Sequence, residues 1–220
     1  MVVDSKPLPI VIATNSSYLV IKRIIDVLFS LLILIPLFIV TVIVAVCIRL
    51  DSKGPIFFRQ KRIGQNGKEF TMLKFRSMYA DSDDSLHRAA IKRYMNGETI
   101  DGNDYKMKDD PRITRVGKFI RKTSIDELPQ FFNVLRGEMT LVGPRPPLPY
   151  EVADYSQRDW LRLVGRPGLT GTWQVYGRSR VQFQEMVEMD LIYLKQQSTL
   201  LDLKLILMTP LVMLSGRGGA

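Results

Sequence analysis

The chain has 220 residues, a length that suits one domain, or one domain with a membrane element, and disfavours a fusion of two enzymes. Its 31 lysines and arginines against 22 acidic residues give a net charge of +9, so phosphates and acidic lipid headgroups are the expected partners. One cysteine, Cys47, and one histidine, His87, exclude an intramolecular disulfide, a multi-thiolate zinc site and most zinc or Ser-His-Asp hydrolases. Carboxylates and cations must therefore carry any chemistry.

An uncharged apolar run extends from Val27 to Ile48, interrupted only by Ser30 and Thr41, and is long enough to cross a bilayer core. Pro36 lies near its middle, where the missing N–H and the ring disrupt a helix. Cations flank the run on both sides: Lys22, Arg23, Arg49, Lys53, Arg59, Lys61 and Arg62. Because positive flanks stay inside, the pattern favours a re-entrant helix-break-helix over residues 20–50. An ordinary transmembrane helix kinked at the proline is the alternative.

Two elements follow the apolar run. Between Pro55 and Met78, apolar stretches surround a turn at residues 64–67, which predicts a β-hairpin. The composition then becomes polar, and we predict a helix over roughly residues 82–95, followed by a loop with Asn-Gly and Asp-Gly turns. His87 falls on this helix, where an exposed histidine is favoured over a catalytic one.

The next segment is rich in cations. Arg112, Arg115, Lys118 and Arg121 recur every three residues, a spacing that brings them near one face of a helix. Such a face is either solvated or binds phosphates and lipid headgroups, and the residues alone favour neither reading.

A capping-box pattern, S-x-x-E, follows at residues 124–127. It predicts Ser124 as a helix N-cap and places Asp126 and Glu127 in the first helical turn. There the exposed N–H groups and the positive end of the helix dipole stabilise a carboxylate and favour a phosphate nearby. Ordinary capping explains the same residues and, taken alone, is the favoured interpretation.

Rigid turns later in the chain carry three arginines. The segment GPRPP, residues 143–147, fixes Arg145 in a position suited to bidentate contact with a phosphate. Arg166 and Arg178 lie in glycine-rich segments whose composition suits a nucleotide diphosphate. No Walker or dinucleotide fingerprint is present.

These elements predict an α+β protein in three parts. Residues 1–19 are expected to form an extension, residues 20–50 the re-entrant membrane helix, and residues 51–220 a small, mainly helical domain with a short β-hairpin. The broken apolar stretch Leu200–Leu214 is too short to span a membrane. It forms either an interfacial helix or a buried C-terminal helix of the domain.

Taken in order, the segments resemble the bacterial sugar transferase family, the small monotopic phosphoglycosyl transferases. The resemblance covers about residues 20–216 and rests on these segments: KRIIDVLFSLLILIP, FFRQKRIG, KFRSM, DPRITRVGKFIRKTSIDELPQFFNVLRGEMTLVGPRP, RPGLTGTWQVYGRS and DLIYLKQQSTLLDLKLILMTP. Each is weak alone, and their joint occurrence in this order is specific. The insertion at about residues 79–108 looks like that of members acting on glucose or galactose.

The resemblance implies transfer of a sugar 1-phosphate from a UDP-sugar to undecaprenyl phosphate, with release of UMP, as the first membrane step of a glycan. It also implies that Asp126 is a nucleophile forming a phosphosugar-aspartyl intermediate, and that Glu127, with Asp126, holds Mg²⁺. A carboxylate that is already ionised needs no histidine as base, which agrees with a single histidine.

Further roles come by position in the family motifs. Arg145, Arg121 and Lys74 match positions implicated in function, with Arg145 the best candidate for phosphate contact. Arg166 and Arg178 are candidates for the nucleotide end. Substrate binding is also predicted for Arg76, although this residue and Lys74 are equally well explained as members of structural ion pairs.

The family is expected at the bacterial inner membrane, with the catalytic domain on the cytoplasmic face. Its implied partners are the UDP-sugar, undecaprenyl phosphate and membrane lipid, with no nucleic acid because no reading element is recognisable. A homodimer is left open. In the family the re-entrant helix breaks at a proline often preceded by serine, whereas Ile35 precedes Pro36 here. The competing interpretation is a non-catalytic membrane scaffold that binds anionic lipid or polysaccharide-assembly proteins.

Overall fold

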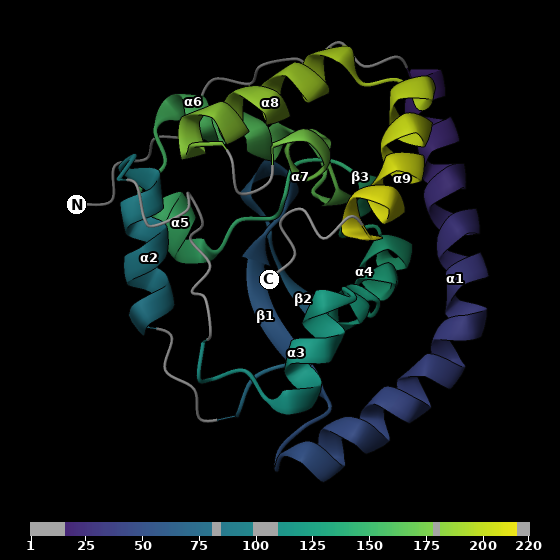
Figure 1. Cartoon of the computed structure of the whole chain (residues 1–220). Helices are drawn as coiled ribbons and strands as arrows, with labels where there is room; N and C mark the ends of the chain where they lie inside the picture. The colour runs from purple at the N-terminus through teal and green to yellow at the C-terminus, as the bar shows by residue number, and fades with distance from the viewer. Residues whose placement is uncertain (1–15, 81–84, 99–109, 178–180, 215–220) are drawn as a thin grey trace.

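The computed structural model describes residues 16–80, 85–98, 110–177 and 181–214. A long helix, α1 (Ser16–Asp51), runs along one side of a domain built from short helices around a central β-hairpin (Figure 1). The other helices are α2 (Ser85–Met95), α3 (Arg115–Lys122), α4 (Gln130–Arg136), α5 (Pro149–Ala153), α6 (Gln157–Trp160), α7 (Thr172–Tyr176), α8 (Phe183–Gln196) and α9 (Thr199–Leu214). The 3₁₀ turns are η1 (Gln65–Gly67), η2 (Ile125–Glu127) and η3 (Leu161–Val164).

The hairpin prediction is confirmed. Strand β1 (Phe57–Ile63) pairs antiparallel with β2 (Glu69–Phe75), and the predicted glycine turn joins them. A second ladder was not foreseen: β3 (Thr140–Val142) pairs in parallel with β4 (Gly168–Thr170). Each of these strands has three residues, too few to give a periodic sequence signal. Helix α2 matches the predicted helix within the described residues, and His87 lies on it half-buried.

Helix α1 is continuous through Pro36, so the predicted break between two helices is not what forms. The helix bends part-way along its length instead (Figure 1). A proline inside a helix removes one hydrogen bond and kinks the helix without ending it when neighbouring groups support both sides. Among the described residues α1 is the one helix long and apolar enough to cross a membrane.

Both halves of α1 pack on the domain. In the first half, Ile25, Phe29 and Ile33 contact a core formed by β2, α4, β3, α8 and α9. In the second half, Leu37, Val44 and Ile48 form a separate cluster with Phe75 of β2 and Ile120 of α3. The domain therefore supports the helix on both sides of the bend.

The opposite face of α1 is apolar and exposed. Only 17% of its most apolar 18-residue window is buried, and Ile35 and Phe38 are each 74% exposed. Helix α9 repeats this pattern, because Leu205 and Asp202 are buried while Leu200, Leu207 and Leu211 are exposed. Helix α9 is thus packed on the domain through one face and apolar on the other, and its place at a membrane interface stays a prediction.

Candidate active site

Asp126 and Glu127 lie in η2, a single 3₁₀ turn between α3 and α4. The predicted capping box is wrong. Ser124 adopts the left-handed conformation (φ 55°), which ends α3, and its side chain makes no capping hydrogen bond. The backbone carbonyl of Ser124 accepts the hydrogen bond from the Glu127 N–H at 3.1 Å instead. A left-handed serine costs roughly 1–2 kcal/mol, so the turn that presents the acidic pair is held by its surroundings.

The acidic pair faces cations from two other elements. Lys74 of β2 forms a 2.7 Å ion pair with Glu127 Oε1. Arg121, in the last turn of α3, acts with Lys74 on the carboxyl group of Asp126 and is half-buried. Asp126 is 7% exposed, whereas the Glu127 side chain is 43% exposed. The fold thus brings together four of the predicted site residues, with one carboxylate buried and the other open to solvent.

The environment of Asp126 sets its acidity. Burial raises the pKa of its carboxyl group to about 6. The negative charge of Glu127 adds to this increase, whereas the positive charges of Lys74 and Arg121 lower the pKa and offset part of it. The group is therefore mostly ionised at pH 7 but weakly solvated. A desolvated carboxylate beside fixed cations is a competent nucleophile toward an electrophilic phosphorus.

Lys74 is positioned by a residue that the sequence did not single out. Asn133 of α4 is fully buried, and its side-chain oxygen accepts from the Leu73 N–H at 3.0 Å. Its amide nitrogen donates to the Thr71 carbonyl at 2.8 Å and to Glu138 Oε2 at 2.6 Å. This amide ties α4 to the strand on which Lys74 lies. Its only signal in the sequence is one asparagine within the apolar run FFNVL.

The GPRPP turn is held from two sides. The buried Arg62 of β1 donates to the Pro146 carbonyl at 2.8 Å. The buried Arg162 donates to the Arg145 carbonyl at 3.3 Å while its guanidinium pairs with Asp190 at 2.5 Å. Buried guanidinium groups thus hold the carbonyls of Arg145 and of the neighbouring Pro146, while phosphate contact by Arg145 stays a prediction.

The side chain of Arg145 has a buried carboxylate as its neighbour. Its guanidinium lies 3.8 Å from the buried Glu151 carboxylate and acts on Asp190 and Tyr155.

The other predicted arginines have different surroundings. Arg76 is buried and donates to the carbonyls of Lys53, Ser52 and Ile48 at the end of α1. Its geometry supports the structural alternative over substrate binding. Arg166 lies near Asp26 of α1, close enough for their charges to interact. Arg178 lies outside the described residues.

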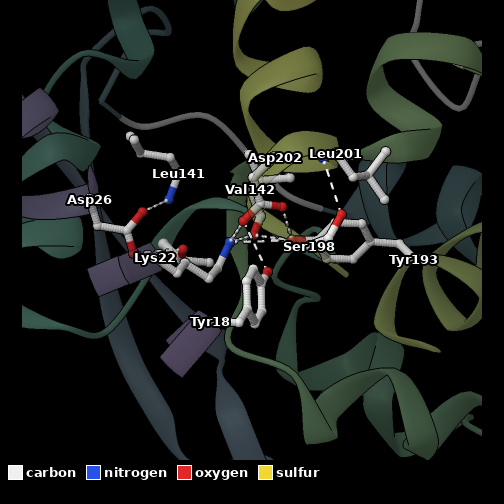
Figure 2. Close-up of polar contacts among 10 residues, drawn as sticks. Tyr18, Lys22, Asp26, Leu141, Val142, Tyr193, Ser198, Leu201 and Asp202 are labelled. Carbon is white, nitrogen blue, oxygen red and sulfur yellow. Dashed lines mark hydrogen bonds and ion pairs between the residues drawn. The ribbon is translucent and has the colours of Figure 1, made fainter. Parts of the chain in front are cut away.

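A buried polar network joins the first half of α1 to the domain (Figure 2). Lys22 pairs with Asp202 of α9 at 2.6 Å and donates to the Val142 carbonyl at 2.8 Å. Asp26 accepts from the Leu141 N–H at 2.9 Å and from the Thr140 hydroxyl at 2.7 Å. Two side chains of α1 therefore hold β3, the strand that leads directly into the GPRPP turn.

A family model described as bacterial sugar transferase matches residues 17–216, nearly the whole chain. The chain belongs to the bacterial sugar transferase family. This finding confirms the family that the ordered motifs predicted, and the match takes in both α1 and the segment that carries Asp126.

Several family members are similar over most of this chain. It is 43% identical over 203 residues to galactosyl transferase CpsE of Streptococcus agalactiae, covering 92% of this chain and 44% of that protein. It is 39% identical over 204 residues to a Klebsiella pneumoniae protein named UDP-glucose:undecaprenyl-phosphate glucose-1-phosphate transferase, covering 89% and 40%. It is 40% identical over 198 residues to exopolysaccharide production protein ExoY of Sinorhizobium fredii, covering 88% and 86%. The chain thus spans less than half of the first two relatives and most of the third.

The oxygen atoms of the acidic pair are of the type that holds magnesium in proteins. Magnesium prefers oxygen ligands and is commonly held by one or two carboxylates, with substrate phosphates and water completing its shell. Asp126 and Glu127 supply such oxygens on adjacent residues, one of them solvent-exposed. Among the residues that the structure describes, no group of three or more His, Cys, Asp or Glu could hold a metal without a substrate.

Proposed function

We propose that this sugar transferase moves a hexose 1-phosphate from a UDP-sugar to undecaprenyl phosphate and releases UMP, as the first membrane step of exopolysaccharide, capsule or O-antigen-type synthesis. One observation carries the proposal: Asp126 is buried with a pKa of about 6, feels the charges of Lys74 and Arg121, and is followed by the exposed Glu127. The name of the Klebsiella pneumoniae relative supports the donor, the acceptor and the transferred group.

The reaction proceeds by two displacements at one phosphorus. A carboxylate oxygen of Asp126 attacks the phosphorus next to the sugar, a phosphorus–oxygen bond forms, and the bond to the UMP oxygen breaks. A phosphate oxygen of the lipid then attacks the same phosphorus, and the aspartyl bond breaks to restore the carboxylate. At a pH above its pKa of about 6, Asp126 is already ionised, so no histidine is needed as a base.

Attack by a carboxylate on an anionic diphosphate is opposed by charge repulsion, which cations must offset. Lys74 and Arg121 are placed to do this at Asp126. We assign Arg145 to phosphate contact, since Arg162 holds its carbonyl and Arg62 holds that of the neighbouring Pro146. A Mg²⁺ held by Glu127 and Asp126 would supply charge neutralisation and orientation of the diphosphate oxygens.

The test is UMP release by the purified full chain with Mg²⁺, undecaprenyl phosphate and a panel of UDP-sugars. We expect release with UDP-glucose or UDP-galactose, and a fall of about three orders of magnitude or more for Asp126→Asn. Asp154→Asn, at an exposed acidic position after α5, is the matched control and should keep full turnover. Without the lipid, intact mass should reveal a phosphosugar adduct on the wild-type chain alone.

The outcomes separate two claims. If no UDP-sugar yields UMP, the transferase proposal fails. If Asp126→Asn keeps its turnover or its adduct, the enzyme stands and the nucleophile is another residue.

We further propose that α1 is re-entrant, so that both of its ends lie on the cytoplasmic face of the inner membrane. Near its start, Tyr18 donates to Asp202 of α9 at 2.9 Å. At its end, Asp51 accepts from the Val116 N–H of α3 at 3.0 Å. A helix that left one end across the bilayer could not keep both contacts with one domain.

Topology is tested with single cysteines in a Cys47→Ser background in sealed inverted and right-side-out vesicles. Ser16→Cys and Lys53→Cys should both react with a membrane-impermeant maleimide from the cytoplasmic side. Periplasmic labelling of the first position would show a spanning helix.

A further inference from the structure

Helix α3 divides the cations of the basic segment between two faces. Arg112, just before the helix, makes a bidentate pair with Asp110, with Nε–Oδ1 at 2.9 Å and Nη2–Oδ2 at 2.7 Å. Arg121 acts on Asp126 and is half-buried. Neither of these arginines is therefore part of the outer surface that the remaining cations form.

The outer surface is a single helix face. Arg115, Lys118 and Lys122 stand at positions i, i+3 and i+7, which align on one side of an α-helix, and all three are exposed. Phe119, at i+4, lies on the same face and is 63% exposed. We call these four residues the α3 outer face. Within the described part of the chain, no hydrogen bond or ion pair joins the side chains of its three cations to another residue.

The inner side of α3 explains its orientation. Gly117 and Ile120 are buried, and Val116 and Ile120 pack against the second half of α1. The helix contains no acidic residue, and the nearby Asp51 and Asp110 are taken by the Val116 N–H and by Arg112. The α3 outer face is thus uniformly positive beside a helix that exposes Phe38, Ile39 and other apolar side chains.

A solvated basic face gives no reason for an exposed phenylalanine among its cations. A membrane surface accounts for both, because anionic headgroups attract cations while the headgroup boundary accepts an apolar ring. We propose that the α3 outer face docks on anionic phospholipid headgroups where α1 enters the bilayer. The inference rests on the membrane seating of α1 proposed above, and it is independent of the transfer chemistry.

The experiment places a fluorophore on the face itself. The full chain with Cys47→Ser and Phe119→Cys is labelled at residue 119 and reconstituted in nanodiscs of phosphatidylcholine, with or without phosphatidylglycerol. A nitroxide quencher is attached to the headgroup of either phosphatidylglycerol or phosphatidylcholine. We expect nitroxide on phosphatidylglycerol to quench the fluorophore more strongly than nitroxide on phosphatidylcholine. Lys118→Gln with Lys122→Gln should lower the local enrichment of phosphatidylglycerol by about 25-fold, since each of the two cations contributes about fivefold at an anionic surface.

The matched control is Lys92→Gln with Arg93→Gln, which removes two exposed cations from α2 and should leave the quenching unchanged. About 1 M salt should remove the preference, because the screening length then falls to about 3 Å. The proposal is overturned if both double variants act equally, or if the preference survives high salt. It is also overturned if undecaprenyl phosphate in phosphatidylcholine, and not phosphatidylglycerol, changes the signal. No UDP-sugar is present, so a failed transferase assay would not affect this result.

Discussion

Asp126, the proposed nucleophile, lies in an unfavourable environment for its charge. The residue is 7% exposed, and burial raises the pKa of its carboxyl group from the ordinary 3.8 to about 6. The native state therefore binds a proton more tightly than the unfolded chain does. The free energy of unfolding that this residue contributes is fully present below pH 3.8 and is lost as pH rises through about 6.

We accordingly predict that Asp126→Asn is more stable than the wild type by about 1–3 kcal/mol at pH 7, while its UMP release is lost. The neutral amide avoids the desolvation of a carboxylate, so the stability difference should shrink toward zero near pH 4. Wild-type turnover should fall as pH drops below about 6, because the nucleophile is then protonated. Denaturant unfolding of both proteins across this pH range is the measurement. A variant less stable than the wild type at pH 7 would contradict the argument.

At this scale the sequence predicted residue types better than conformations. Asp126, Glu127, Lys74 and Arg121 were predicted as site residues and lie together. The capping box at Ser124 was wrong because the S-x-x-E pattern does not reveal whether the serine is extended or left-handed. Only the way α3 ends against its neighbours decides that conformation.

At the scale of elements, α4 and β2 are joined by one amide. Asn133 uses its oxygen for the Leu73 N–H and its nitrogen for the Thr71 carbonyl and Glu138. We predict that Asn133→Asp, although isosteric, is at least as harmful as Asn133→Ala. The new oxygen would face a carbonyl and a carboxylate in a buried site, at a cost of about 1–3 kcal/mol or more.

Denaturant unfolding and UMP release measure this effect on stability and on the position of Lys74. Glu138→Gln in the Asn133→Asp background should recover part of both losses, since the glutamine amide donates where the glutamate repels. Asn96→Asp, in the exposed turn after α2, is the control and should change neither. Equal stability of Asn133→Asp and wild type would refute the role given to the amide.

The elements that the sequence predicted are those with a strong local signal. The hairpin has a glycine turn between apolar strands, and α1 has an uninterrupted apolar run. Strands β3 and β4 pair with each other across a long sequence separation. The N–H of Thr140 donates to the Pro167 carbonyl, and the N–H of Gly168 donates to the Pro144 carbonyl. A pairing between three-residue strands leaves no local pattern to detect.

At the scale of the whole molecule, α1 packs on the domain through one face and exposes an apolar surface on the other. The sequence predicted its apolarity and its cationic flanks, but it did not predict that one face of α1 packs along two separate clusters of the domain. That outcome depends on residues more than a hundred positions away, such as Thr140 and Asp202. The membrane seating that we propose for α1 is therefore coupled to domain packing through this one helix.

Asp26 makes this coupling testable, because it links α1 to β3 and so to the turn that carries Arg145. Asp26→Ala leaves the buried Leu141 N–H and Thr140 hydroxyl without their acceptor, which costs about 1–3 kcal/mol. We predict that this variant loses stability and most of its turnover. Asp26→Asn should keep most of both, since its oxygen still accepts from Leu141 and the Thr140 hydroxyl can rotate to accept from its nitrogen. The two variants are distinguished by their rates of UMP release at saturating and at limiting UDP-sugar, and by their unfolding, both measured on protein reconstituted in nanodiscs. If they lose turnover equally, the charge of Asp26 matters more than its two hydrogen bonds, and the coupling is electrostatic.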